Sequence, residues 1–191
     1  MTCIVALETA DQIYIAGDSA SVEYQTLRMN VRPDEKVFLK EHKNNQPMLV
    51  GFCASWRVGQ LVRYRLDVPK HPPGMYVDEF LISSFIPALQ SCFQTSNAII
   101  MNNGNNQSLG QFVIAYCGRL FTIETDFHLA HHSCGFVAVG SGADLAMGSL
   151  FTSAKYPSNP EERVTMALDA ACAFNAGVCR PYTIKSVGKK K

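Results

Sequence analysis

Several segments in the first third of the chain combine β-branched and apolar residues, partly in alternation with polar ones, and this pattern predicts β-strands. Residues 10–11 can turn the chain between the first two of these segments, so a hairpin is expected from the second residue onward. A polar loop then leads to a second pair, joined by the polar turn 42–45. The four predicted strands are 2–9, 12–16, 36–39 and 47–53.

The next part of the chain has apolar residues at helical spacing. The pattern predicts one helix over 55–66 and a second over about 77–94. Asp78 and Glu79 lie in the first turn of the second helix, where negative charge favours the helix dipole. Pro87 lies inside it and predicts a kink or a break.

Strands resume after the turn-rich segment 101–107. A helix is expected from Gly142 to about Ser153, and a further helix begins where Asn159 can act as its cap. The expected strands are 112–116, 120–124, 136–139 and 182–187. The order is strands, two helices, strands, two helices and one strand, which predicts two sheets between two helical layers in a single domain over 1–191.

Composition and charge exclude several classes of function. The chain has 191 residues, of which 47% are hydrophobic and 17% charged, as in a soluble globular protein. A formal net charge of +1 gives no reason to expect a nucleic acid or a membrane surface as a partner. No segment approaches the roughly 20 apolar residues of a membrane span, and the start of the chain does not resemble a secretory signal.

Cysteine usage indicates a reducing compartment. The seven cysteines are an odd number and form no C-x-x-C pair, so we expect free thiols in a cytoplasmic protein. The histidines of segment 128–132 lack a thiolate or carboxylate at a spacing that would complete a metal site. We therefore expect neither a metal nor another cofactor.

Several short motifs follow one another over nearly the whole chain: Met1-Thr2 before a strand, Ala16-Gly17-Asp18-Ser19, Lys36-Val37, Gly51-Phe52, Gly140-Ser141-Gly142, and a last helix and strand. In this order they resemble the motifs of proteasome β subunits and of the related bacterial ATP-dependent peptidase. The resemblance implies an α+β fold, the four-layer αββα sandwich of N-terminal-nucleophile (Ntn) hydrolases. In that fold two antiparallel sheets lie between helical layers.

The resemblance also implies site residues. Thr2, exposed when Met1 is removed, matches the family's nucleophile. Asp18 matches its buried aspartate, and Lys36 matches its catalytic lysine. Ser141 matches the serine near the terminal amine.

Two site positions do not match the family directly: the catalytic lysine has two candidates, and an alanine replaces a glycine. Lys36 is preferred over Lys40 as the catalytic lysine because an apolar strand follows it directly. Ala54 lies where the family usually has a glycine whose backbone N–H contributes to the oxyanion hole, and a backbone donor survives this replacement.

The clearest departure from the family is in the last helix. The family places an aspartate there, which helps to hold the serine and the terminal amine. The matching stretch 171–175 has no carboxylate, and Ala173 lies within it. Asp169, one helical turn before Ala173, and Asn175, two residues after it, are the two candidates to replace this carboxylate. The remaining alternative is that the position has lost its role.

These residue types are suited to nucleophilic catalysis. A threonine hydroxyl needs a base, and a free α-amino group with a pKa of ~7.7–8.0 can supply one. A lysine ammonium nearby would favour the neutral amine and stabilise charge on the hydroxyl oxygen, while Asp18 would orient the lysine. The expected reaction forms an acyl-enzyme on Thr2, which water then hydrolyses.

Each candidate also has a purely structural interpretation. Thr2 can be an ordinary strand residue, Asp18 can belong to a turn, and Lys36 can be a solvent-facing charge. Ser141 can cap a helix. Cys3 is an alternative nucleophile, although strand alternation should turn its side chain to the opposite face from Thr2.

The leading functional hypothesis is a threonine-type peptidase that acts on peptides or unfolded proteins. By analogy with the family, it would form a ring-shaped homo-oligomer around a chamber. The sequence leaves open whether an AAA+ unfoldase is a further partner. One alternative is a non-catalytic structural or assembly protein with the same fold. Another is an Ntn amidohydrolase of small amides.

Overall fold

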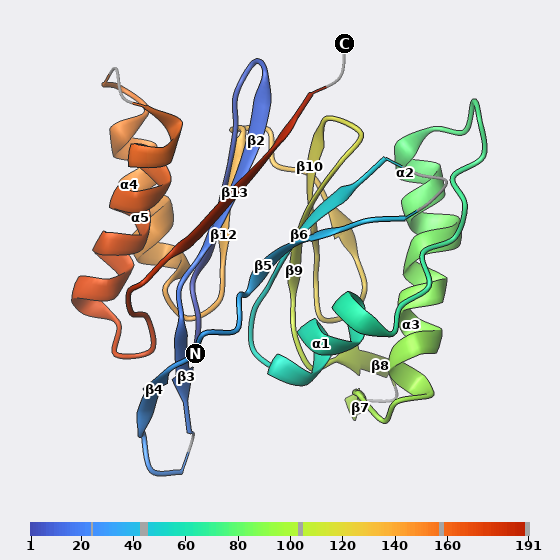
Figure 1. Cartoon of the computed structure of the whole chain (residues 1–191), viewed down its shortest axis with the longest axis horizontal. Helices are drawn as coiled ribbons and strands as arrows, with labels where there is room; N and C mark the ends of the chain where they lie inside the picture. Colours follow the sequence, from blue (N-terminus) through green and yellow to red (C-terminus); the bar gives the residue numbers. More distant parts are fainter. Residues whose placement is uncertain (24, 43–45, 103–104, 157–158, 190–191) are drawn as a thin grey trace.

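The computed structural model describes residues 1–23, 25–42, 46–102, 105–156 and 159–189. The predicted turn at 42–45 and the centre of the segment 101–107 therefore lie partly outside the described residues. The chain folds into two larger antiparallel sheets with helices on their outer faces (Figure 1).

The first sheet has the strand order β12-β1-β2-β13 and contains both the first strand and the last. Strands β1 and β2 form the hairpin predicted at the start of the chain, with Val5 opposite Ala16. Residues 136–139 pair with β1 on its other side. The four strands are β1 (Ile4–Glu8), β2 (Gln12–Gly17), β12 (Phe136–Val139) and β13 (Thr183–Gly188).

The second sheet has the order β11-β10-β9-β6-β5. Its central strands β6 and β9 are buried along their whole lengths, as the continuous apolar runs in their sequences predict. The five strands are β5 (Val37–Lys40), β6 (Met48–Phe52), β9 (Phe112–Tyr116), β10 (Arg119–Ile123) and β11 (Leu129–Ala130).

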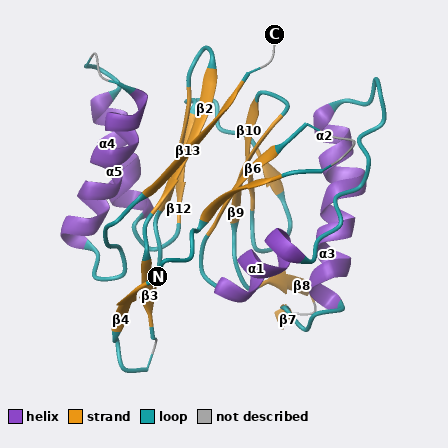
Figure 2. Ribbon diagram, viewed as in Figure 1, coloured by secondary structure: helices purple, strands orange, loops and turns teal. Residues whose placement is uncertain are grey.

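Helices cover the outer face of each sheet, as the ribbon in Figure 2 shows. Helices α4 (Ala143–Ser153) and α5 (Pro160–Phe174) pack on each other and on the first sheet. Helix α1 (Trp56–Tyr64) lies on the side of the second sheet. A longer helical segment lies on the same side and consists of α2 (Val77–Phe80), a π-helical turn (Leu81–Phe85) and α3 (Ile86–Gln94). Ser55 caps α1 and Asn159 caps α5 through their side chains, the latter as predicted.

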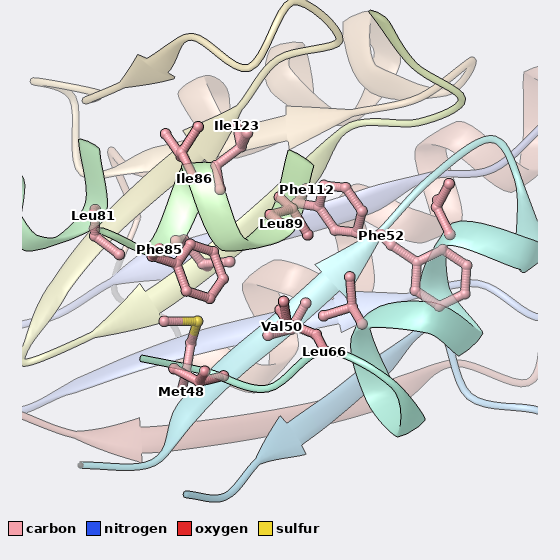
Figure 3. Close-up of a cluster of buried hydrophobic side chains, with 14 of the residues drawn as sticks. Met48, Val50, Phe52, Leu66, Leu81, Phe85, Ile86, Leu89, Phe112 and Ile123 are labelled. Carbon is pink, nitrogen blue, oxygen red and sulfur yellow. The ribbon is translucent and has the colours of Figure 1, made fainter. Parts of the chain in front are cut away.

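Three apolar clusters form the core, and the alternation of β1 explains two of them. Val5 and Leu7 face α4 and α5, whereas Ile4 and Ala6 face the space between the sheets. The third and largest cluster lies between the second sheet and α1 and α3. Figure 3 shows part of it, including Phe52, Phe85 and Phe112.

Two short hairpins are absent from the sequence prediction. The polar loop after β2 contains the hairpin β3 (Ala20–Val22) and β4 (Met29–Val31), and the turn-rich segment contains β7 (Ile99–Asn102) and β8 (Asn105–Ser108). The three residues of β4 are all exposed, and their alternation of apolar and polar side chains is too short to mark a strand. These hairpins form by local backbone pairing, which leaves little trace in hydrophobic periodicity.

The long helix around Pro87 continues instead of breaking. Its π-helical turn ends at Phe85, immediately before Ile86 and Pro87 begin α3. Proline removes a backbone donor and crowds the preceding turn, and a wider turn accommodates that local disturbance. In the described part of the chain, no helix is long and apolar enough to cross a membrane.

Candidate active site

Thr2 lies just before β1, and its side chain is almost fully buried, with 3% exposure. The Lys36 ammonium donates a hydrogen bond to Thr2 Oγ1 over 3.0 Å. The chain still carries Met1, whose carbonyl oxygen accepts a hydrogen bond from Thr2 Oγ1 at 2.5 Å. Thr2 N is therefore an amide nitrogen in this structure, and it donates to Ser141 Oγ over 3.2 Å.

Lys36 lies directly before β5 and is 2% exposed, so the solvent-facing interpretation of this lysine is wrong. Besides Thr2, its ammonium donates to Asp18 Oδ1 at 2.9 Å and to the Ala20 carbonyl at 2.7 Å. All three ammonium hydrogens thus have acceptors. Burial lowers the pKa of Lys36 from its ordinary value, and the charge of Asp18 opposes that shift.

Asp18 follows β2, and its carboxylate accepts hydrogen bonds from three backbone N–H groups. Its Oδ1 accepts from Cys3 N at 2.9 Å, and its Oδ2 accepts from Ala20 N at 2.7 Å and from Cys179 N at 3.4 Å. The bond to Ala20 is a local turn contact, so a turn role coexists with the ion pair to Lys36. The carboxylate fixes the lysine and joins three segments of the chain.

A glycine explains how these segments come so close. Gly17 pairs with Ile4 across the first hairpin. A Cβ at position 17 would lie 2.7 Å from Ile4 Cδ1 and 3.1 Å from Val37 Cγ2. An added Cβ would have to displace these two side chains, so the glycine favours the approach of β5 to the end of β2, and this approach places Lys36 beside Asp18.

Ser141 contacts Thr2 rather than capping a helix. The N-cap residue of α4 is Gly142, not Ser141, and among the described residues no side chain caps this helix. Ser141 Oγ lies 3.2 Å from Thr2 N and 3.4 Å from the Thr2 carbonyl oxygen. Gly140 has a φ of +96°, and a Cβ there would lie 2.3 Å from the Thr2 carbonyl oxygen, so the turn needs a glycine.

Of the two candidates to replace the missing carboxylate, the structure brings Asn175 to the site. Its Nδ2 donates to the Ser141 carbonyl at 2.7 Å, and its Oδ1 lies 3.3 Å from Ser141 Oγ. Asp169 instead accepts hydrogen bonds from Arg180 at 2.6 Å and from Tyr182 at 2.9 Å. The sequence marked Asn175 only by its place two residues after Ala173.

Ala54 follows β6 with a φ of +72°, a conformation that suits the glycine expected there better than alanine. Cys53 N donates to the Gln111 carbonyl at 3.0 Å. Among the described residues, the Ala54 N–H has no hydrogen-bond acceptor, so this donor is available to a ligand.

The competing residues lie in other environments. Lys40 donates to the Arg63 carbonyl at 3.0 Å, away from the contacts of Thr2. Cys3 is fully buried in the cluster that faces α5, on the opposite side of the strand from Ile4, as alternation predicts. Burial raises the pKa of the Cys3 thiol to about 12, so it is a poor nucleophile at neutral pH.

A small recess lies beside the Trp56 ring. The Lys36 ammonium lies 5.4 Å from the centre of the Trp56 ring, and the guanidinium carbon of Arg32 lies 4.8 Å from the same ring centre. The recess lies beside this ring and is lined by Asp34, Glu35, Phe52, Trp56, Gly59, Gln60, Arg63 and Tyr64. Its lining includes Glu35, which precedes Lys36, and the aromatic residues Phe52 and Trp56, which flank residues 53–55.

The histidines of segment 128–132 take part in other contacts. His131 Nε2 lies 2.6 Å from Asp78 Oδ1, and His132 Nε2 lies 3.1 Å from Thr122 Oγ1. Over the described ranges, no group of three or more histidine, cysteine, aspartate or glutamate side chains could hold a metal ion. Each of the seven cysteines is a free thiol in the described chain.

Comparison with known proteins gives a clear result only for the structure. The sequence matches no protein-family model and no curated protein. The fold is similar to that of BPH from Thiobacillus denitrificans, with a TM-score of 0.79, 16% identity and coverage of 98% of both chains.

Two further similar structures are HslV from Trypanosoma brucei and Anbu, the ancestral beta-subunit, from Yersinia bercovieri. HslV has a TM-score of 0.69 at 13% identity, with 97% of this chain and 99% of that chain covered. Anbu has a TM-score of 0.68 at 13% identity, with 97% of this chain and 81% of that chain covered. The chain therefore has the α+β fold of these proteins.

Proposed function

We propose that this chain is a divergent proteasome β-subunit-type Ntn hydrolase that forms one domain with the four-layer αββα arrangement. Its activity is that of a threonine peptidase, with Thr2 as the nucleophile once Met1 has been removed. The observation that carries this proposal is the buried Lys36 ammonium, which contacts both Thr2 Oγ1 and Asp18. An ion pair buried against a hydroxyl is costly to build and is typical of a functional site.

Removal of Met1 supplies the base. The Thr2 nitrogen then becomes a primary amine, next to its own hydroxyl and within reach of Ser141 Oγ. The neutral amine takes the hydroxyl proton, and Oγ1 attacks the peptide carbonyl carbon. The scissile C–N bond breaks, and the leaving nitrogen takes the proton from the ammonium.

The second half of the reaction repeats these steps with water. The acyl group is now an ester on Thr2 Oγ1, and the terminal amine accepts a proton from the attacking water. The ester bond breaks, the product leaves as a carboxylic acid, and Oγ1 regains its hydrogen. The free N–H of Ala54 is the proposed donor to the oxyanion in both halves.

Lys36 acts on charge rather than as the base. Its ammonium stabilises negative charge that develops on Thr2 Oγ1, and it disfavours protonation of the nearby amine. The contacts with Asp18 and the Ala20 carbonyl hold it in place. A fixed charge in a buried position acts more strongly than one in water.

The structural neighbours suggest the ligand class and the assembly. BPH from Thiobacillus denitrificans was solved in complex with epoxomicin, and the Anbu complex of Pseudomonas aeruginosa forms a helical assembly. For this chain we propose peptides or unfolded proteins as substrates, a ring-forming homo-oligomer in the cytoplasm, and an AAA+ unfoldase as a candidate partner.

The alternative is a non-catalytic subunit. While Met1 is bonded to it, Thr2 N is an amide without basic character, and the Met1 carbonyl oxygen accepts a hydrogen bond from the Thr2 hydroxyl. A chain that keeps Met1 would retain the fold without this chemistry.

The test is hydrolysis by a chain whose Thr2 is exposed by cleavage of an N-terminal fusion, so that activity does not depend on natural processing. A panel of fluorogenic peptides should be cleaved by this chain and by the control variant Lys40→Ala. Thr2→Ala should reduce cleavage to background. Equal cleavage by Thr2→Ala would show that Thr2 is not the nucleophile.

A further inference from the structure

Asn175 lies directly after α5 as its C-cap, and its amide makes three hydrogen bonds at the site. Its Oδ1 accepts from Gly177 N at 2.9 Å, and its Nδ2 donates to the Ser141 carbonyl at 2.7 Å. The third partner is Ser141 Oγ, 3.3 Å from Oδ1. The side chain therefore contacts both the backbone and the hydroxyl of the serine next to Thr2.

These partners require an amide. Gly177 N is a donor, so it must face the amide oxygen, and the Ser141 carbonyl is an acceptor, so it must face the NH₂ group. A carboxylate would place one of its oxygens against the Ser141 carbonyl oxygen, where neither atom has a hydrogen to donate. The position is thus constructed for a neutral side chain.

The charge environment of the Thr2 nitrogen follows from this neutrality. The nitrogen reaches Asn175 through a single atom, Ser141 Oγ, by contacts of 3.2 and 3.3 Å. A carboxylate at that distance would favour a protonated amine. The charge of Asp18 is already matched by the Lys36 ammonium.

Three thiols lie in the segments around Thr2, Lys36 and Asp18. They belong to the residue before β1, the residue after β6 and the segment before β13, and burial raises the pKa of each: Cys3, Cys53 and Cys179. They are neutral at physiological pH. Because the Lys36 ammonium that contacts Thr2 Oγ1 is already paired with Asp18, an acidic residue at position 175 would add an unbalanced negative charge to this network.

We infer that Asn175 is a positioning residue that orients Ser141 and, because it is neutral, lets the terminal amine of Thr2 act as a base at a lower pH than a carboxylate there would allow. This inference rests on the proposed function. It makes Asn175 a functional residue in its own right and assigns the enzyme a pH range shifted toward acid.

The experiment compares three variants of the fusion-exposed chain. Asn175→Asp should raise the pH at half-maximal kcat/KM by about one unit, because the added carboxylate stabilises the ammonium. Asn175→Ala should lower kcat about tenfold without moving that pH, because it frees Ser141 but adds no charge. Met166→Asp is the matched control. It adds the same charge at an exposed position of α5, more than two turns before Asn175, and should leave the pH profile unchanged.

The amine itself gives a second readout that needs no substrate. In a chain labelled with ¹³C-threonine, the pH titration of the Thr2 signal should show the same upward shift in Asn175→Asp and none in the other two variants. If Asn175→Asp fails to fold, Asn175→Ala still tests the orientation of Ser141.

The outcomes separate the two claims. Absence of hydrolysis by the wild type would overturn the proposed function. An active wild type whose pH midpoint and amine titration match those of Asn175→Asp, or whose kcat equals that of Asn175→Ala, would overturn the inference about Asn175.

Discussion

Lys36 Nζ lies 3.0 Å from Thr2 Oγ1, although 34 residues separate the two positions in sequence. The lysine directly precedes an edge strand of one sheet, and the threonine precedes a strand of the other. The contact therefore exists only when the two sheets are packed together. Folding itself assembles the candidate catalytic pair.

The ion pair between Lys36 and Asp18 should matter for stability. Lys36→Met would leave a buried carboxylate without its cation, and breaking a buried pair in this way costs about 3–5 kcal/mol. Lys185→Met is the control, because Lys185 forms a partly exposed pair with Glu35 at 3.1 Å and should contribute at most about 1 kcal/mol. Urea denaturation measures both. Equal losses in the two variants would show that Lys36 and Asp18 do not form a buried pair.

Stability should depend on alkaline pH through the same lysine. Burial lowers the pKa of Lys36 below its ordinary value of 10.5. Between the lowered pKa and 10.5 the unfolded chain binds more protons than the folded chain, so the lysine's contribution to stability rises with pH. The free energy of unfolding of the wild type, minus that of the double variant Asp18→Asn with Lys36→Met, should increase over this window. A difference that falls with pH would contradict the depressed pKa.

Gly140 should be necessary for the position of Thr2. In Gly140→Ala the new Cβ would meet the Thr2 carbonyl oxygen at 2.3 Å, at a φ that disfavours any side chain. We expect a loss of more than about 1 kcal/mol of stability and at least a tenfold fall in activity. Gly148→Ala is the matched control, since an added Cβ there meets nothing within 4 Å. That helical change should stabilise the fold by up to about 1 kcal/mol, and a similar effect of both variants would refute the steric argument.

Cys3 should be unreactive although it neighbours the nucleophile. Burial raises the pKa of its thiol to about 12, so little thiolate exists at pH 8. Iodoacetamide at that pH should modify the exposed Cys134 first and leave Cys3 unmodified in the folded protein, as peptide mass spectrometry can measure. Rapid alkylation of Cys3 would reopen it as the alternative nucleophile.

The longer elements could be predicted from the sequence because hydrophobic spacing marks them directly. The run at 136–139 is an example, since it forms β12 over the predicted residues. The hairpin of β3 and β4 could not be predicted, because each strand has only three residues, too few for an alternation of apolar and polar side chains to mark it. The π-helical turn before Pro87 also had no signal beyond the proline.

The site was accessible to sequence reasoning only in part. Motif order named Asp18, Lys36 and Ser141, and the structure brings each of them into contact with Thr2 or with one another. The choice between Asp169 and Asn175 could not be made from spacing, because both lie near the end of one helix. It depended on the direction in which each side chain leaves that helix, and this direction is a tertiary property.

The most direct test of the central claim is the mass of the N-terminal peptide before and after treatment with a peptide epoxyketone of the epoxomicin type. Such a reagent carries two electrophilic carbons, which a hydroxyl and an amine on the same residue can attack. The account predicts a chain without Met1 and a single adduct located on Thr2, absent from Thr2→Ala. A purified chain that retains Met1, or an adduct that persists in Thr2→Ala, would contradict it.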